Sequence, residues 1–175
     1  MKTLVLSGLF ALASSGIVAL AQTAPSAVNA PGSDDPVQNE VALVTQAHDT
    51  ARADDDATTD AHLQAPSKLP EAPPASVLLA RRAMMLCGWL QNDNDYQRAE
   101  KVARRAIAAL ANQAEKTDPD REERLYWEAC LEARILDHKV RAIALLRAAE
   151  KLKPDDERLP DLELPLVAAV NAFGH

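Results

Sequence analysis

Cysteine, glycine, aromatic residues and positive charge are all scarce in this sequence. Its 175 residues include two cysteines, five glycines and 3% aromatic residues, and 19 basic against 26 acidic residues give a net charge of -7. Two cysteines exclude a disulfide-stapled scaffold, and the lack of a basic footprint argues against a dedicated nucleic-acid binder. Glycine is absent from Trp89 to Phe173, and no alternating strand pattern is found. We therefore expect an all-α domain.

The negative charge is confined to one part of the chain. Residues 22–75 carry nine acidic and two basic residues, whereas residues 76–175 carry 17 acidic and 16 basic residues. Residues 76–175 therefore have the composition of a nearly neutral globular domain, and the negative charge lies in residues 22–75. This division gives three parts, namely 1–21, 22–75 and 76–175.

The first 21 residues have the pattern of a secretory signal peptide. Lys2 supplies a short positive start, Leu4 to Leu20 is apolar apart from Ser and Gly, and Ala19-Leu20-Ala21 ends the stretch with small residues. We predict cleavage before Gln22 and export to the periplasm or the extracellular space, without stable membrane insertion afterwards. The alternative is an uncleaved anchor, because the apolar stretch reaches the lower limit of about 17 residues for a membrane span.

Residues 22–75 are predicted to be a disordered, acidic, proline-rich linker. They hold seven of the eleven prolines and no aromatic residue, so they lack the apolar surface to offset the entropy of ordering. One stretch differs, because Val37, Val41 and Val44 follow Asp35-Pro36 at helical spacing and allow a short helix to about Arg52. A solvated linker is favoured over a metal site, for which the candidate ligands would be His48, Asp54, Asp56, Asp60 and His62.

Apolar residues at spacings of three and four predict five helices in the last hundred residues. Ser76, Asp95 and Asp118-Pro119 are expected at the first three helix starts, since such residues satisfy the free N–H groups there. The predicted helices cover residues 76–91, 95–116, 118–136, 139–153 and 160–173. The first four form two helix pairs, and the short fifth helix would cap the second pair.

The two predicted pairs repeat at an offset of 43 residues, which aligns Cys87 with Cys130 and Ala106 with Ala149. The anchors of the second pair resemble the tetratricopeptide (TPR) repeat, whose period is about 34 residues. These anchors are Tyr126, Ala142, Leu146, Ala149 and Pro154, and in the first pair Asp95-Tyr96, Ala99 and Ala106. The resemblance covers about residues 80–154. It implies a TPR-like array, for which about three repeats are usually needed.

TPR-like arrays bind partners in a concave groove lined by the first helix of each pair. The resemblance therefore implies a protein–protein interaction module, an adaptor or scaffold, whose partner is a peptide or protein of acidic character. Trp127 is the expected anchor, because buried aromatic residues and arginines dominate binding energies; the alternative is that it packs against a neighbouring pair or the last helix. The predicted partner-binding residues are Arg81, Met84, Gln91, Arg124, Trp127, Leu131 and Arg134, with Gly88 beside them.

The acidic run from Asp54 to Asp60 is expected to dock on these arginines in the free protein and to compete with the partner. A homo-oligomer that closes the open end of the array is the structural alternative. An envelope hydrolase is a third reading, but His138 and His175 have no nucleophile at a useful offset, so no catalytic residue, metal or cofactor is predicted. Cys87 and Cys130 are expected to be buried free thiols. Stacked helices lie about 8 to 10 Å apart, which is too far for a disulfide bond.

Overall fold

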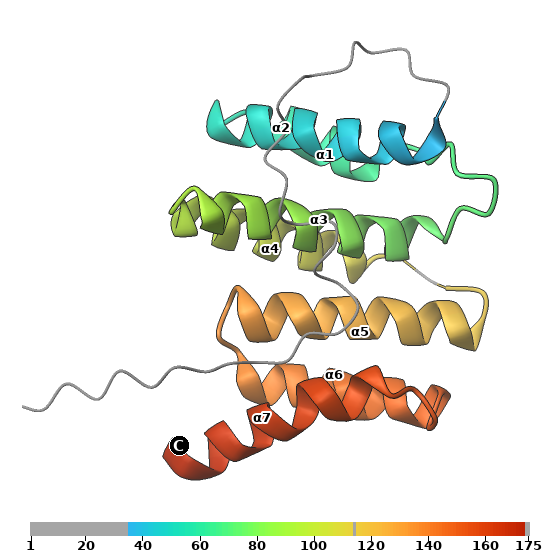
Figure 1. Cartoon of the computed structure of the whole chain (residues 1–175), viewed down its shortest axis with the longest axis vertical. Helices are drawn as coiled ribbons and strands as arrows, with labels where there is room; N and C mark the ends of the chain where they lie inside the picture. The colour runs from blue at the N-terminus through green and yellow to red at the C-terminus, as the bar shows by residue number, and fades with distance from the viewer. Residues whose placement is uncertain (1–34, 114, 174–175) are drawn as a thin grey trace, which may run out of the picture. The chain divides into compact units, whose positions relative to one another are not determined.

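The computed structural model describes residues 35–113 and 115–173. Within these residues it contains seven helices and no strand (Figure 1), so the all-α prediction is confirmed. The predicted signal peptide, residues 1–21, lies outside the described residues. The helices are α1 (Pro36–Arg52), α2 (Asp56–Gln64), α3 (Ala75–Asn92), α4 (Tyr96–Leu110), α5 (Asp118–Arg134), α6 (Lys139–Leu152) and α7 (Arg158–Phe173).

Neighbouring helices pack in pairs, α1 with α2, α3 with α4 and α5 with α6. Each pair turns through a residue with positive φ: Asp54 at 58°, Asn94 at 62° and Asp137 at 56°. Short polar side chains tolerate this left-handed conformation better than most. In the first two turns the next residue caps the second helix, since the Asp55 and Asp95 carboxylates accept backbone hydrogen bonds.

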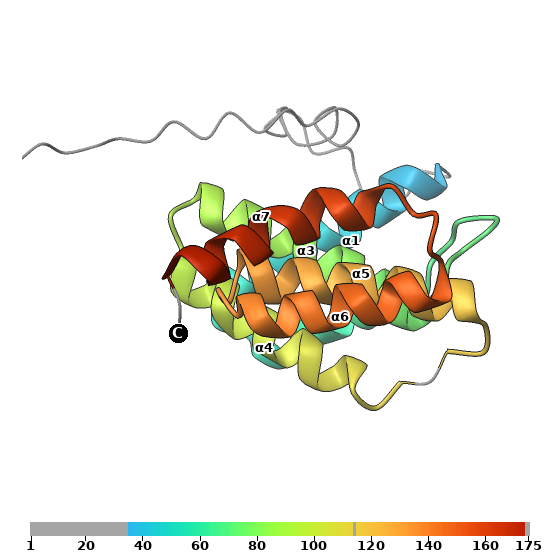
Figure 2. The same ribbon diagram turned by 90° about the horizontal axis from the view of Figure 1, so that it is seen from below.

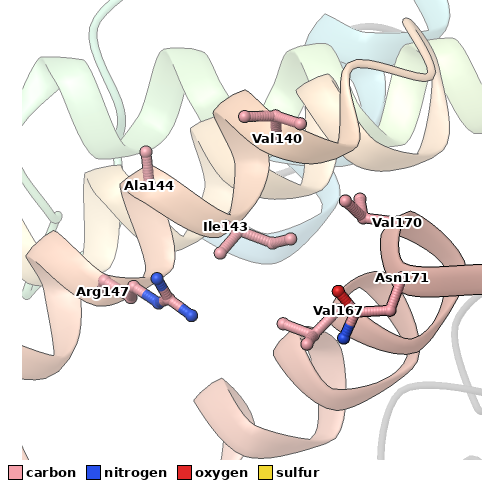
Figure 3. Close-up of a pocket in the computed structure, with 7 residues that line it drawn as sticks. All are labelled: Val140, Ile143, Ala144, Arg147, Val167, Val170 and Asn171. Carbon is pink, nitrogen blue, oxygen red and sulfur yellow. The ribbon is translucent and has the colours of Figure 1, made fainter. Parts of the chain in front are cut away.

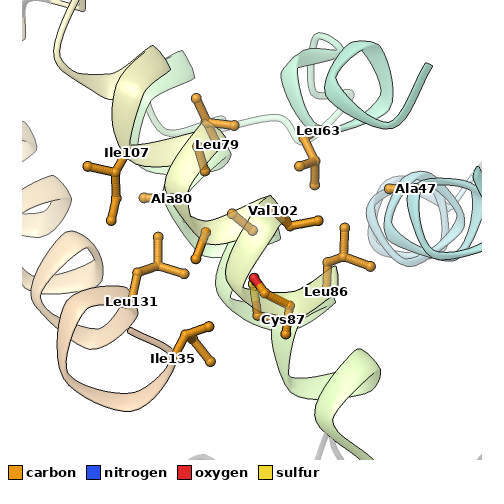
Figure 4. Close-up of a cluster of buried hydrophobic side chains, with 14 of the residues drawn as sticks. Ala47, Leu63, Leu79, Ala80, Leu86, Cys87, Val102, Ile107, Leu131 and Ile135 are labelled. Carbon is orange, nitrogen blue, oxygen red and sulfur yellow. The ribbon is translucent and has the colours of Figure 1, made fainter. Parts of the chain in front are cut away.

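The first pair, α1 and α2, corrects the prediction that residues 22–75 form a disordered linker. Helix α1 begins as its sequence indicated, with Asp35 accepting a hydrogen bond from the Val37 N–H and Pro36 at the first helical position. Helix α2 was not predicted. Val44 and Leu63 from this pair are buried in one apolar cluster with side chains of α3 and α4, and Figure 4 shows Leu63 in this cluster. Residues 22–34 lie outside the described part of the chain.

The predicted bounds of three later helices also need correction. Helix α3 starts at Ala75 after Pro74, which makes no side-chain cap, and Ser76 is buried within the first turn. Helix α4 ends at Leu110 and not near Lys116. Helix α7 begins at Arg158, two residues earlier than expected. None of the described helices meets the length and hydropathy needed to span a membrane.

Two apolar clusters form the core. The first joins side chains from α1 to α5 (Figure 4), and the second joins α5, α6 and α7. Met84 and Trp127 are partly buried and pack against both. Each cluster contains one cysteine, and Cys87 and Cys130 are both buried and free, as predicted. Burial raises the pKa of the Cys87 thiol to about 12, so this group is protonated at neutral pH.

Helix α7 follows the third pair and packs along α6 (Figures 1 and 2). Leu159 and Leu166 are buried in the second cluster, and an ion pair of 2.9 Å joins Arg147 of α6 to Glu163 of α7. Pro165 lies inside the helix, where it removes one backbone hydrogen bond. The role of α7 as a cover on the last pair agrees with its predicted position.

Candidate functional site

Arg81 of α3 and Trp127 of α5 are the predicted partner-binding residues that the structure brings into contact. The Arg81 guanidinium carbon lies 5.8 Å from the centre of the Trp127 ring, within the range of a cation–π contact. The Arg81 side chain is 43% exposed, and Trp127 is partly buried. We call the surface formed by Arg81, Met84, Met85, Glu123 and Trp127 the Trp127 face.

Glu123 is the central polar group of this face. Its carboxylate accepts a 2.8 Å hydrogen bond from Trp127 Nε1 and pairs with Arg81. It also accepts a 2.8 Å hydrogen bond from Arg158 of α7. Burial acts to raise its pKa, but the hydrogen bonds from Arg158, Arg81 and Trp127 prevail and lower the pKa of Glu123 to about 2. Glu123 is therefore ionised and already matches much of the Arg81 charge.

Arg158, at the start of α7, covers one edge of the Trp127 face. Its guanidinium lies 4.4 Å from the centre of the Tyr126 ring and pairs with Asp156 at 2.6 Å. The hydrogen bond from Arg158 lowers the pKa of Asp156. Burial, and next the charge of Asp156, raise the pKa of the neighbouring Glu122. This ion cluster fixes the N-terminus of α7 on α5.

Two predicted binding residues are not available to a partner as expected. Leu131 is 0% exposed and belongs to the first apolar cluster, because the outer side of α5 at this turn packs on α3. Arg124 is largely buried between Glu115 and Glu128. Its Nε lies 2.7 Å from Glu115 Oε1, in an orientation that makes an ion pair without a hydrogen bond. Both residues stabilise the fold.

The remaining predicted residues are spread along α3 and α5. Met84, Gly88 and Gln91 are partly buried, and Arg134 is exposed at the end of α5. Sequence reasoning missed Met85, which is 39% exposed, and Glu123. A stripe through Arg81 and Met85 at a spacing of four would have found the first. Glu123 lies in the first turns of a predicted helix, where an acidic side chain is favourable for the helix dipole, so the sequence alone does not place it opposite Arg81.

The acidic run of the first pair does not dock on the Trp127 face. It packs against α4, where Asp54 pairs with Arg98 at 2.9 Å, Asp56 with Lys101 at 2.7 Å and Asp60 with Arg105 at 2.6 Å. Hydrogen bonds from Arg98 and Lys101 lower the pKa of Asp54 and Asp56, respectively. The predicted competition between this run and a partner for the groove therefore has no support in the structure.

The histidines and cysteines named above as candidates for metal binding or catalysis make contacts within the fold or are buried in it. His48 contacts Asp93 at 2.9 Å and the edge of Trp89, and His138 Nδ1 lies 2.8 Å from the buried carboxylate of Glu132. Burial raises the pKa of Cys130 as well as that of Cys87. Across residues 35–113 and 115–173, no three His, Cys, Asp or Glu side chains are grouped so that they could hold a metal ion.

A separate apolar cleft opens between α6 and α7 (Figure 3). It consists of two adjoining hollows of about 490 and 700 Å³ that share Val140, Ala144 and Val170. Val140 is 70% exposed, although it is a large apolar residue. Arg147, Lys139 and Arg141 lie at the edge of the cleft. This surface was not singled out from the sequence.

Comparison with known proteins supplies no functional residues for these surfaces. No protein-family model matches the chain, no curated protein matches it, and no solved structure matches it. The functional assignment therefore depends on the contacts of the Trp127 face.

Proposed function

We propose that this chain is an exported, TPR-like interaction module that binds a peptide or protein partner through the Trp127 face. The contact between Arg81 and Trp127 carries the proposal. These two residues come from the first helices of successive pairs, and their side chains are partly open to solvent. Tryptophan and arginine are both among the residues enriched where binding energy concentrates at interfaces.

The number of helix pairs supports an array of this kind. Two pairs fall short of the roughly three repeats that a stable array needs, and the helical segment α1–α2 provides a third. The first helices α1, α3 and α5 are in contact in sequence order, as stacking of repeated units requires. Tyr126, Ala142, Leu146 and Ala149 are buried at the positions of the TPR anchors. The signal-peptide pattern of residues 1–21 supports export.

The chemistry of the Trp127 face suggests what the partner offers. Met84, Met85 and Trp127 provide an apolar contact, and methionine adapts easily to different side chains. Arg81 remains partly exposed beside Glu123, and Arg134 is exposed further along α5. A partner segment with an apolar side chain and a nearby carboxylate fits this surface. The partner's carboxylate would compete with Glu123 for Arg81.

The test uses variants that alter exposed groups of the face. The full chain serves as bait for partners from the cell envelope, and the affinity of each purified partner is then measured. We expect Arg81→Ala and Met85→Ala each to weaken binding by about tenfold, because they remove surface contacts without opening the core. Arg104→Ala is the matched control, since Arg104 is exposed on α4 and pairs with Glu100.

The proposal fails if Arg81→Ala and Met85→Ala bind every captured partner as tightly as the wild type and Arg104→Ala do. Hydrogen exchange on the complex gives a second reading. Amides of α3 and α5 should become more protected than those of α4 when the partner is added.

A further inference from the structure

Gly88 is a glycine inside α3 for which the packing of the fold gives no reason. It is the single glycine in the described part of the chain, and a methyl group added to its Cα would meet nothing within 4 Å. Its backbone is helical, a setting in which alanine is more favourable than glycine. Glycine at this position serves neither a turn nor a close contact between helices. Its effect is a notch in the surface of α3.

The notch lies on the open side of α3, two turns beyond Arg81. Gly88 follows Arg81 by seven residues, so the two positions share one face of the helix. Met84 and Met85 lie one turn before the notch, and Gln91 lies one turn after it. Met85 is 39% exposed, and Met84 and Gln91 are partly buried. The notch therefore continues the Trp127 face along α3.

Arg134 lies at the same level on α5, two turns beyond Trp127. Helices α3 and α5 run in the same direction and contact each other (Figure 1). Ile135 of α5 is buried in the same cluster as Cys87 of α3 (Figure 4). Because these two residues are the sequence neighbours of Arg134 and Gly88, the guanidinium and the notch belong to one stretch of surface.

Arg134 is also the arginine whose charge the fold leaves unmatched. Its side chain is exposed. Within residues 35–113 and 115–173 every other arginine makes an ion pair, whereas none is found for Arg134. A place in the last turn of α5 suits a positive charge but does not neutralise it. A carboxylate is the complementary group, because it can accept two parallel hydrogen bonds from a guanidinium.

We propose that Gly88 and Arg134 form a second subsite of the Trp127 face, which takes an acidic side chain of an extended peptide. This inference rests on the proposed function, since it extends the same surface. The peptide backbone lies over Gly88, its carboxylate pairs with Arg134, and an apolar side chain contacts Trp127. A helix about 10 to 12 Å across is too wide to enter a notch left by one missing side chain.

The distance between the subsites predicts a spacing in the peptide. Seven residues of helix separate the two levels, which corresponds to about 10 Å along α3 or α5. In an extended chain of the polyproline II type, residues three apart lie on the same side and about 9 Å apart. The peptide should therefore carry an apolar residue and an aspartate or glutamate three positions away.

The test uses peptides of known sequence as the probe. A displayed library of random peptides about twelve residues long is selected on the full chain, and enriched sequences are synthesised. We expect these sequences to carry the apolar and acidic residues three positions apart. Their binding should weaken by about tenfold in Arg134→Gln. It should weaken at least as much in Gly88→Gln, because the added side chain fills the notch.

Two measurements control for changes in the fold. Ala108→Gln should bind the peptides like the wild type, since Ala108 is exposed on α4 and receives the same side chain away from the Trp127 face. Gly88→Gln should unfold at a urea concentration no lower than the wild type does, because glutamine favours a helix more than glycine and the added Cβ meets open space. A less stable Gly88→Gln would mean that the fold itself requires glycine, and would overturn the inference.

Three further results would overturn the second subsite and leave the proposed function standing. The first is a peptide that loses affinity in Arg81→Ala but binds Gly88→Gln and Arg134→Gln as tightly as the wild type. The second is enrichment of acids seven positions from the apolar residue, which means that the peptide binds as a helix. The third is no enriched peptide from a chain that captures an envelope partner through Arg81. Enriched peptides that bind Arg81→Ala and Met85→Ala as tightly as the wild type would instead contradict the proposed function itself.

Discussion

Glu123 and Glu128 lie on the same helix, five residues apart, and their pKa values shift in opposite directions. Arg158, Arg81 and Trp127 donate to Glu123 and, against the effect of burial, lower its pKa to about 2. Burial raises the pKa of Glu128, although Arg124 and Arg141 oppose this effect. The two pKa values differ because of the groups that donate to each carboxylate. Glu123 is contacted by Trp127 of α5, Arg81 of α3 and Arg158 of α7. The two carboxylates should therefore affect stability oppositely as pH changes.

Substitution of each carboxylate by glutamine tests this expectation. The stabilising effect of Glu123 is present above its ordinary pKa of 4.5 and is lost as the pH falls toward about 2. We expect Glu123→Gln to lower the free energy of unfolding by about 2 kcal/mol at neutral pH, and by progressively less below pH 4.5.

The contribution of Glu128 to stability changes with pH in the opposite direction, because its folded-state pKa lies above its ordinary value of 4.5. Its favourable contribution is present below that value and is lost as the pH rises through the folded-state pKa. Glu128→Gln should therefore gain stability relative to the wild type as pH rises. Urea unfolding across this pH range measures both variants, and parallel curves for the two would contradict the assignment.

At the level of helices, Arg82 ties the first pair to the second. This side chain of α3 is 3% exposed and donates two hydrogen bonds of 2.9 Å to the Glu40 carboxylate of α1. It also donates to the carbonyl oxygens of Leu63 and Ala65 at the end of α2, at 3.0 and 2.5 Å. A single guanidinium thus holds both helices of the pair. Ion pairs between the acidic run and α4 are more exposed and contribute less.

Replacement of this buried group should be costly. Arg82→Met keeps most of the side-chain volume but removes the buried cation from the Glu40 carboxylate, which retains the Ser67 hydroxyl as donor, and leaves two carbonyls without the guanidinium. We expect a loss of about 3 to 5 kcal/mol in the free energy of unfolding. Arg98→Met, which removes the more exposed pairs with Asp54 and Asp95, should cost no more than about 1 kcal/mol. Equal losses in chemical denaturation would show that Arg82 does not hold the pair.

The helices that differ most from the sequence prediction are those whose stability comes from neighbours. Helices α5 and α6 were predicted well, because their apolar spacing and the position of Pro119 in the first turn of α5 lie within each segment; the cap of α5 is Thr117 and not Asp118, and α6 has no side-chain cap. Helix α2 was missed, because Leu63 and Thr59 are the only side chains it buries and its contacts come from other helices, chiefly α1 and α3, with Arg105 of α4 pairing with Asp60. An acidic composition indicated disorder, while the arginines that match it lie about 45 residues later.

The candidate site was also predicted only in part, because the contacts that bury a side chain come from other helices. Helical spacing placed Arg81 and Trp127 on related stripes, and these residues do meet. It did not show that Leu131 faces α3, or that Glu115 and Glu128 bury Arg124. Position around one helix is set by the 3.6-residue period, whereas burial depends on which helix lies opposite. The ion cluster around Arg158 required the position of α7, which no local pattern gives.

For the whole molecule, the main consequence is that residues 36–64 belong to the folded array. Ala47 and Leu63 are buried in the same cluster as Leu86 and Leu131 (Figure 4). The array therefore has three pairs and a covering helix, with the Trp127 face between the second and third pairs. Without the first pair, the buried side of α3 would be exposed to water. The proposal for the Trp127 face needs this arrangement, because that face exists only when α3 and α5 of successive pairs are stacked.

Native-state hydrogen exchange of the full chain tests the stacking most directly, because it reports protection of each backbone amide. We predict that amides within α1, between Glu40 and Ala51, exchange about as slowly as those of α3. Amides of α2 around Leu63 should also be protected, since this residue is in the same cluster. Exchange of residues 36–64 at the rate of an unstructured peptide, alongside protected α3 to α6, would contradict the three-pair array. It would instead support a disordered linker in this part of the chain.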